Sequence, residues 1–235
     1  SDAFAGFVEH FVGQLTPDCD VGQLLLSCVD EFRRLLQDSG LGVSNPVVGL
    51  LGELVVLERL TAMWAEAWRT WGRPGSERHD FRNGSVALEV KSSLRSALAE
   101  PLVHISASDQ LVPPSGGRLF LAWFRFEHDP AGAVSLPRLV DAVRPRLPAD
   151  GQESLDAAVR MVVGSSGLPD RRYSIGHELT FHVHDGFPAI VPNRFVRGSV
   201  DPGVTHLSYE INLSFVQGQA LPFHVAAGAL QGSEA

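Results

Sequence analysis

The sequence predicts a single α/β (α+β) domain with additional segments at both ends. Its 235 residues are 44% hydrophobic and 20% charged, which is ordinary globular composition and enough length for one large core. Segments with apolar residues at helical spacing alternate with short apolar segments bounded by Gly, Pro and Asn, which indicate strands and turns. We find no repeat and no clear linker, so one layered domain is the simplest organisation.

Two amphipathic helices are expected near the start of the chain. Apolar residues recur at intervals of three and four over residues 2–15 and again over residues 21–36. A loop then leads to Ser44-Asn45-Pro46, where a capping residue precedes a proline at the first helical position. We therefore treat residues 1–46 as an N-terminal helical segment.

Residues 47–130 are expected to form the core. An apolar stripe predicts a long helix from Val47 to Trp71, which ends at the glycines that follow. The strands predicted after it are a hairpin at 78–92, a short strand at 102–106 and an apolar strand at 118–126. Residues 131–235 are expected to be a helical and β extension packed on this core. Its predicted helices are 135–147 and 152–163, and its predicted strands are 179–183, 189–191 and 207–213.

The β-hairpin is the strongest local signal in the sequence. Asn83-Gly84 stands between two strand-like segments, which predicts a two-residue type I′ turn. This turn predicts the cross-strand pairs Arg82–Ser85, Phe81–Val86 and Asp80–Ala87. Because side chains alternate across a sheet, the hairpin has an apolar core face and a polar face. The core face carries Phe81, Val86, Leu88 and Val90, and the polar face carries Asp80, Ala87, Glu89 and Lys91.

The polar face of the hairpin combines two carboxylates with the only lysine of the chain. All the other basic residues among the 19 Lys and Arg are arginines. Asp80 and Glu89 are predicted to be diagonal neighbours, roughly 7–8 Å apart at the backbone, which allows both to bind one hard cation such as Mg²⁺. Lys91, one pleat further along, can touch a metal-bound water or a reacting phosphate. A solvated sheet face has the same alternation of charged and apolar residues, so that alternative stays open.

The arrangement resembles the PD-(D/E)xK nuclease superfamily. The resemblance rests on Asp80, then Glu89-x-Lys91 across a hairpin, with Glu53 on the preceding helix; His79 stands where the motif has proline. Further blocks between residues 47 and 213 look like a bacterial family of PD-(D/E)xK motif proteins linked to restriction and phage-defence loci. These blocks are Gly49–Leu54, His79–Phe81, Ala87–Ser93, His104–Ser106, Asp109–Leu111 and Ser208–Ile211.

The resemblance implies a restriction-endonuclease-like core with a mixed central sheet flanked by helices. The core order of helix, hairpin, strand, helix and strand then falls on residues 47–71, 78–92, 102–106, 108–112 and 118–126. Asp80, Glu89 and the carbonyl of Val90 would bind Mg²⁺, for which Mn²⁺ can substitute. Lys91 would position or activate the attacking water, and Glu53 would be a further acidic ligand or a base.

Other polar residues are candidates for supporting the site or contacting DNA. They are Gln110, His104, Ser92 and Arg82, and each also has an ordinary structural interpretation as turn, strand-end or surface polarity. A set of arginines could line a DNA path despite the net charge of −8. These are Arg69, Arg73, Arg78, Arg82, Arg95, Arg171, Arg172, Arg194 and Arg197.

Together with these residues, the resemblance implies a Mg²⁺-dependent DNA endonuclease of the restriction type, acting in anti-phage defence. One alternative is a catalytically silent nuclease-fold subunit that serves as a DNA-binding or assembly module of a defence complex. A third is a metal-independent binding or regulatory protein in which the hairpin is only a sheet edge. The acidic total argues against a protein that coats DNA non-specifically.

The expected partners are DNA, other defence-system proteins and a second copy in a homodimer, with no membrane. The two cysteines, Cys19 and Cys28, have no CxxC spacing and read as reduced buried thiols. No apolar run reaches membrane-spanning length and no basic-then-apolar leader opens the sequence. These observations lead us to expect a cytoplasmic protein.

Overall fold

The computed structural model divides the chain into two compact units, Ser1–Asn45 and Pro46–Ala235. The residues that it describes are 8, 10–16, 20–25, 27–28, 45–72, 78–94, 100–164, 168–191, 194, 203–204 and 207–232. In the first unit, residues 10–13 and 21–25 are helical, and Cys28 is a buried free thiol. The rest of the two predicted N-terminal helices, together with Cys19, lies largely outside the described residues.

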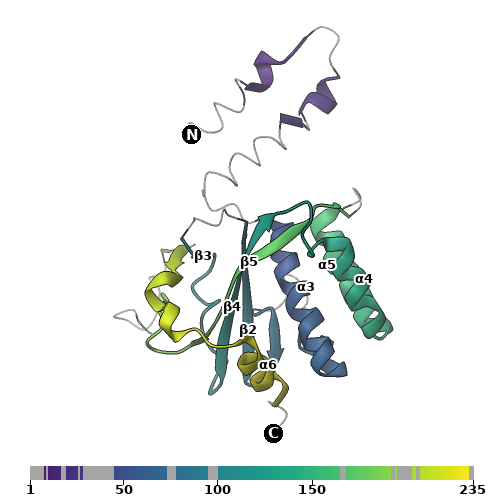
Figure 1. Ribbon diagram of the computed structural model, residues 1–235. Helices are drawn as coiled ribbons and strands as arrows, with labels where there is room; N and C mark the ends of the chain where they lie inside the picture. The colour runs from purple at the N-terminus through teal and green to yellow at the C-terminus, as the bar shows by residue number, and fades with distance from the viewer. Residues whose placement is uncertain are drawn as a thin grey trace. The chain divides into compact units, whose positions relative to one another are not determined.

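The second unit is built on a four-stranded sheet of mixed direction (Figure 1). Its strands, in spatial order, are β1 (Phe81–Asn83), β2 (Val86–Leu94), β4 (Arg118–His128) and β5 (Tyr173–Val183). β2 and β4 are parallel, whereas the outer pairs β1–β2 and β4–β5 are antiparallel. The prediction of a mixed α/β protein with helices flanking a mixed sheet is therefore confirmed, and the architecture is consistent with a restriction-endonuclease-like fold.

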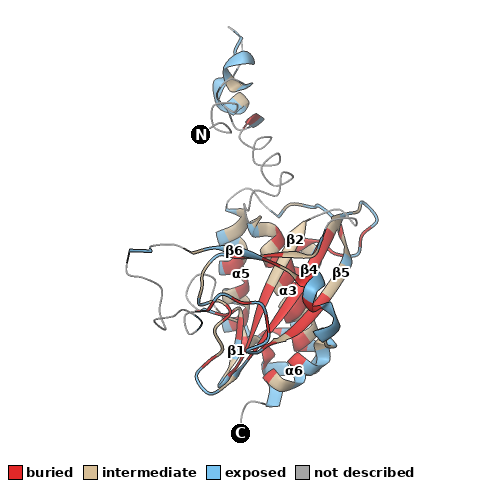
Figure 2. Cartoon of the chain, turned by 90° about the vertical axis from the view of Figure 1, so that its left-hand side faces the viewer, coloured by how far each residue is buried: buried red, intermediate tan, exposed pale blue. Residues whose placement is uncertain are grey.

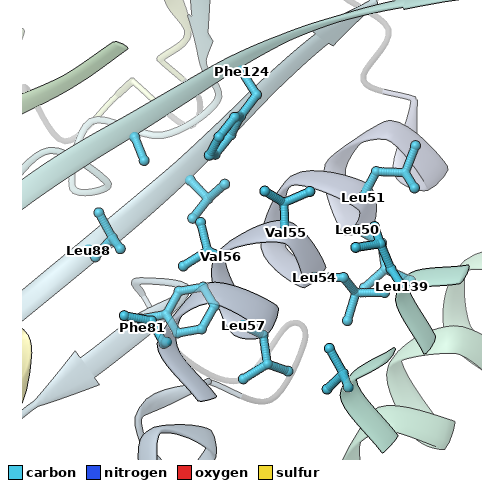
Figure 3. Close-up of a cluster of buried hydrophobic side chains, with 14 of the residues drawn as sticks. Leu50, Leu51, Leu54, Val55, Val56, Leu57, Phe81, Leu88, Phe124 and Leu139 are labelled. Atoms are coloured by element: carbon cyan, nitrogen blue, oxygen red, sulfur yellow. The ribbon is translucent and has the colours of Figure 1, made fainter. Parts of the chain in front are cut away.

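Helices cover one face of this sheet (Figure 1). They are α3 (Pro46–Met63), α4 (Leu136–Val143), α5 (Ala149–Val163) and α6 (Phe223–Gln231). Their apolar side chains form the larger core with alternate residues of β2 and β4. Figure 3 shows Val56 beside Phe81 and Leu88 of the hairpin, while Leu54 lies beside Leu139 of α4. The helix α3 is therefore held between the sheet and its neighbouring helix. None of the described helices combines the length and the apolar character needed to cross a bilayer.

The opposite face of the sheet carries a second core. The strands β3 (Leu102–Ile105) and β6 (Tyr209–Asn212) form a separate antiparallel pair, and β3 and β6 contribute Val103, Ile105 and Ile211 to this core. It also contains Ala87, Leu121 and Trp123, so β2 and β4 are buried on both faces (Figure 2). The prediction that 102–106 is the third strand of the central sheet is wrong, because β4 takes that place.

Other predicted elements differ in extent. The long helix ends at Met63, where Trp64 is extended, and a 3-10 helix, η1 (Ala65–Thr70), continues to Trp71. The segment 108–112 is a turn, 189–191 contains no strand, and α6 was not predicted. The predicted helix 135–147 consists of α4 and the 3-10 turn η2 (Arg144–Arg146), and another 3-10 segment, η4 (Leu213–Gln219), follows β6. Ser135 caps α4 by accepting a hydrogen bond from the backbone N–H of Arg138 at 3.3 Å.

An ion pair ties α3 to the far strand of the sheet. The guanidinium of Arg59 donates two hydrogen bonds to the carboxylate of Glu178 on β5, at 2.5 and 2.8 Å. The same guanidinium lies 5.5 Å from the ring centroid of Phe124 and 5.3 Å from that of Phe223. The bidentate geometry and the two aromatic neighbours fix where the helix sits along the sheet.

A glycine nearer the start of α3, Gly52, allows the helix to approach β2 closely. A Cβ added at Gly52 would lie 2.0 Å from Ser92 Oγ and 3.2 Å from Val90 Cγ1. A side chain at position 52 would require Ser92 to turn its hydroxyl away and Val90 to shift, or the helix and strand to move apart. Gly52 precedes Glu53, so the same close approach determines how far Glu53 stands from the hairpin.

We expect Gly52→Ala to lower the free energy of unfolding by about 1–3 kcal/mol, because the new methyl group overpacks the helix–strand contact. Gly49→Ala is the matched control, since a Cβ there meets nothing within 4 Å and should stabilise the helix by about 0.5–1 kcal/mol. Urea denaturation measures both. Adding Ser92→Ala to Gly52→Ala should restore part of the loss; equal stability of the two glycine variants would contradict the close approach.

Candidate functional site

The hairpin places Asp80 directly across from Glu89. The observed pairs are Phe81–Leu88, Arg82–Ala87 and Asn83–Val86, and one further step in this register pairs Asp80 with Glu89. The predicted register is wrong, because Asn83 belongs to the strand and the turn consists of Gly84 and Ser85. Gly84 has φ 54°, and no described residue other than glycine has a positive φ, which is the pattern of a type II′ turn.

The predicted faces of the hairpin survive this correction. The pairing moves by two residues, and a shift of two leaves every side chain on its original face. Phe81, Val86, Leu88 and Val90 lie in the helix-facing core, and Ala87 lies in the other. Asp80 and Glu89 are thus direct rather than diagonal neighbours, which brings them closer than predicted.

Asp80 is held by the backbone of the neighbouring strand. Its Oδ2 accepts a hydrogen bond of 2.7 Å from the N–H of Val90, which fixes the carboxylate beside β2. The preceding His79 is buried and hydrogen-bonded to the backbone of Val112. Burial and the positive charge of Arg78 lower the pKa of His79 to about 4, so its ring is neutral at neutral pH. A neutral buried ring here adds no positive charge beside Asp80.

Glu89 and Lys91 form an ion pair within the site. Lys91 Nζ lies 2.8 Å from Glu89 Oε1, with 3% of the glutamate side chain and 19% of the lysine side chain exposed. The other carboxylate oxygen, Glu89 Oε2, is buried and has no hydrogen-bond partner in the described part of the chain. An acceptor in that position usually has a partner, so this oxygen is available to a bound group.

Glu53 joins the site from α3. Its Oε2 accepts a hydrogen bond of 2.9 Å from Trp71 Nε1, and Trp71 itself pairs with Phe81 at the start of the hairpin. Burial and the nearby charge of Asp80 raise the pKa of Glu53 to about 8, while Trp71 and Lys91 oppose the increase. Glu53 therefore lies within electrostatic reach of both the aspartate and the lysine.

Three carboxyl groups thus share one ammonium group. Burial and the charge of Asp80 raise the pKa of Glu89 to about 8, and burial raises the pKa of Asp80 against the opposing effect of Lys91. Burial alone would lower the pKa of Lys91, but the charges of Glu89 and Asp80 outweigh it and raise that pKa. With more carboxyl groups than cations, the protein alone leaves negative charge uncompensated when these groups ionise.

The residues present suit a hard divalent cation. Within the described ranges, no group of three or more His, Cys, Asp and Glu side chains is arranged to hold a metal ion by itself. The donor set at the hairpin is smaller and consists of carboxylate oxygens from Asp80 and Glu89, including the unpartnered Oε2. Mg²⁺ is commonly bound through one or two carboxylates with water completing its coordination, so the chemistry of this pair fits it.

The other predicted candidates have contacts of their own. Gln110 Oε1 accepts hydrogen bonds from the N–H and the hydroxyl of Ser106, which stabilises a turn. His104 lies on β3, opposite Glu210 of β6. Arg82 is exposed and donates to the carbonyl of Gly84. Arg73, Arg95 and Arg197 lie outside the described residues.

Ser92 and the carbonyl of Val90 are the remaining candidates. Ser92 faces Gly52 of α3, on the side opposite Lys91. Val90 contacts the site through its backbone N–H, which donates to Asp80. A ligand role for its carbonyl stays a prediction.

Two aromatic residues of the site were not identified from the sequence. Trp71 was assigned to the end of a helix, and nothing local indicates that its indole reaches Glu53. Tyr209 on β6 lies within the electrostatic range of Lys91, and its hydroxyl accepts a 3.0 Å hydrogen bond from the N–H of Ile190. Tyr209 belongs to one of the blocks that carry the family resemblance, which is the one signal that pointed to it.

The raised pKa values predict a pH dependence of stability in the metal-free protein. Between pH 4.5 and about pH 8, Glu89 keeps a proton in the folded protein that it loses on unfolding. Its contribution to the free energy of unfolding is therefore full below pH 4.5 and is lost as the pH rises through the folded pKa of about 8. Glu89→Gln should therefore raise the free energy of unfolding at the upper end of this range by about 2 kcal/mol and change it little at the lower end.

Urea denaturation in EDTA at both ends of this pH range measures the difference between the two proteins. Glu153→Gln on the exposed side of α5 is the matched control and should leave the profile unchanged. A Glu89→Gln protein that loses stability at the upper pH would contradict the conclusion that the ionised site holds uncompensated negative charge.

Comparison with known proteins identifies the family. Residues 12–214 match a family model described as "Putative PD-(D/E)XK family member, (DUF4420)". No curated protein and no solved structure matches the chain. The match spans most of the sequence, including α3, the hairpin and the strand β6. The chain belongs to this PD-(D/E)XK family.

Proposed function

We propose that the protein is a Mg²⁺-dependent DNA endonuclease of the restriction type, acting in anti-phage defence. The observation that carries this proposal is the convergence of Asp80, Glu89 and Glu53 on the single lysine of the chain. Buried carboxyl groups with raised pKa values cost stability when they ionise, so their presence together favours a functional role. Membership of a PD-(D/E)XK family supports phosphodiester hydrolysis as that role.

Asp80 and Glu89 would hold the metal, with the carbonyl of Val90 as a further candidate ligand. A bound Mg²⁺, for which Mn²⁺ would substitute, supplies a Lewis acid and an activated water. The hydrogen bond from the Val90 N–H keeps Asp80 turned toward β2, so one carboxylate is oriented before any ligand arrives. Burial excludes bulk water from the Glu89 side of the pair.

Lys91 would act as a cation toward the reacting phosphate. Its raised pKa keeps its amine protonated at neutral pH, so it orients the nucleophile and offsets negative charge rather than removing a proton. Glu53 is better placed for proton transfer, because a carboxyl with a pKa of about 8 exchanges its proton readily near neutral pH. Trp71 would position Glu53 through its indole N–H.

A catalytically silent DNA-binding or assembly subunit is the alternative function. The complete set of Asp80, Glu89 and Lys91 favours the enzyme, because a subunit released from catalysis has no need to keep three charged groups buried together. A cleavage assay on methylated and unmethylated DNA, with and without Mg²⁺, separates the two functions. Binding to other defence-system proteins and formation of a homodimer stay predictions.

Lys91→Ala should lower the rate of plasmid cleavage by at least about 100-fold, because it removes the positive charge beside the reacting phosphate. Lys91→Arg should also be strongly impaired, since the larger planar guanidinium cannot take the place of a compact ammonium beside Glu89. Conversion of supercoiled to linear plasmid measures the rate, and circular dichroism verifies folding. Unchanged cleavage by folded Lys91→Ala protein would refute the enzyme assignment for this site.

Mg²⁺ should raise the melting temperature of the wild-type protein, because a ligand that binds only the folded state stabilises it. Asp80→Asn and Glu89→Gln should each largely abolish this increase, while the exposed control Glu153→Gln should retain it. Differential scanning calorimetry with Mg²⁺ or EDTA measures metal binding without any cleavage. An equal increase in all four proteins would place the metal elsewhere.

A further inference from the structure

The two-stranded sheet of β3 and β6 packs on the face of the central sheet that carries Lys91. In the parallel pairing of β2 with β4, Glu89 lies opposite Leu121 and Lys91 lies opposite Trp123, so these four side chains share one face. Leu121 and Trp123 belong to the second core, which also contains Ile105 of β3. The β3–β6 pair is therefore placed to bring further side chains to the candidate site.

Tyr209 of β6 approaches Lys91 from this second sheet. It lies opposite Ile105, which is fully buried, and its ring packs against the second core. Burial raises the pKa of Tyr209, and the positive charges of Arg194 and Lys91 oppose that increase, so the phenol lies within electrostatic reach of both cations. The function proposed above assigns no role to Tyr209 or Arg194.

The hydroxyl of Tyr209 is fixed in position and keeps its proton for another partner. Its oxygen accepts a 3.0 Å hydrogen bond from the backbone N–H of Ile190, and this bond lies at the exposed surface. A phenol can also donate one hydrogen bond, and no acceptor for it is found among the described residues. The side chain is half-buried, so a bound group can reach the hydroxyl from solvent.

Arg194 supplies an exposed cation beside the same tyrosine. Its Nη1 donates a 2.9 Å hydrogen bond to the carbonyl of Ala189, and its Nη2 donates to the carbonyl of Asp185. Both acceptors are neutral backbone atoms, and no carboxylate within the described ranges forms an ion pair with this guanidinium. A guanidinium carries five N–H groups, so Arg194 keeps donors and an unpaired charge for a further acceptor.

The combination of these side chains identifies the class of partner. Lys91, Tyr209 and Arg194 offer an ammonium, a hydroxyl and a guanidinium from separate elements, which suits an extended anion better than a small one. A DNA strand carries one negative charge per nucleotide, roughly every 3.4 Å along the helix axis. A strand with its reacting phosphate at Lys91 would therefore carry further phosphates across the neighbouring surface.

We propose that Tyr209 and Arg194 hold the backbone of the substrate strand next to Lys91, the tyrosine by a hydrogen bond from its hydroxyl to a phosphate oxygen and the arginine by its charge. This inference rests on the proposed function for the position of the reacting phosphate. Lys91 is already paired with Glu89, whereas the charge of Arg194 is free to offset that of a phosphate. Such contacts position the strand and carry no base specificity.

Binding measured without cleavage tests these two contacts. The probe is a fluorescein-labelled DNA duplex in EDTA, followed by fluorescence anisotropy at several salt concentrations. Tyr209→Phe should weaken binding by about 3- to 10-fold with the same salt dependence, because it removes a neutral donor. Arg194→Gln should weaken binding and lower the slope of log K against log salt by about one, because it removes one phosphate-paired cation.

Three further variants serve as matched controls. Ile190→Pro removes the N–H that Tyr209 accepts but keeps the tyrosine hydroxyl, so it should bind the duplex as the wild-type protein does. Arg160→Gln removes an exposed arginine from α5, among the helices on the other side of the sheet, and should leave the slope unchanged. Arg194→Lys loses the paired contacts to the two carbonyls but keeps the charge, so it should retain the wild-type slope.

The outcomes separate this inference from the proposed function. Weaker binding by Tyr209→Phe and a lower slope for Arg194→Gln, in a protein that never cleaves DNA, would support the two contacts and refute the endonuclease. Cleavage by the wild-type protein, with unchanged affinity and slope in both variants, would support the endonuclease and overturn the contacts. An equal loss of affinity in Ile190→Pro and Tyr209→Phe would show that the tyrosine only anchors the loop, which also overturns its contact with DNA.

Discussion

The arrangement of this protein depends on the burial of three carboxyl groups around one ammonium group. Glu53 comes from α3, Asp80 from the start of the hairpin and Glu89 from β2, so helix and sheet must meet closely for the group to exist. Gly52 allows that approach, and the pairing of Arg59 with Glu178 anchors the helix at the far strand. The packing of α3 thus serves the electrostatics of the site as well as the core.

The composition of the polar face could be predicted from the sequence, whereas its register could not. Alternation along a strand is local, so Asp80, Glu89 and Lys91 fall on one face for any even shift of the pairing. The register depends on which residues form the turn. Asn83 is the last residue of β1, and its side chain donates a 2.9 Å hydrogen bond to the carbonyl of Leu230 in α6, far along the sequence. No pattern near the turn contains that information.

The other differences between expectation and structure also come from contacts between distant segments. The apolar stripe continues past Met63, but Trp71 must reach both Phe81 and Glu53, and the chain leaves the α-helix before it. The segment 102–106 has the composition of a core strand, yet its partner is β6. The helix α6 lacks a capping side chain and was missed for that reason. Its apolar residues form a helix that packs against the larger core.

Unpartnered polar atoms lie together on the face of the sheet that carries Lys91. They are a carboxylate oxygen of Glu89, the hydroxyl of Ser93, which can donate and accept, and the indole N–H of Trp123, which can only donate. A fold selected for stability alone would replace such atoms with apolar groups, as it has done at Ala87 and Leu121 on the same face. Trp68, His79, Ser92 and Thr180 have unpartnered atoms as well, so lack of a partner gains meaning here only from position.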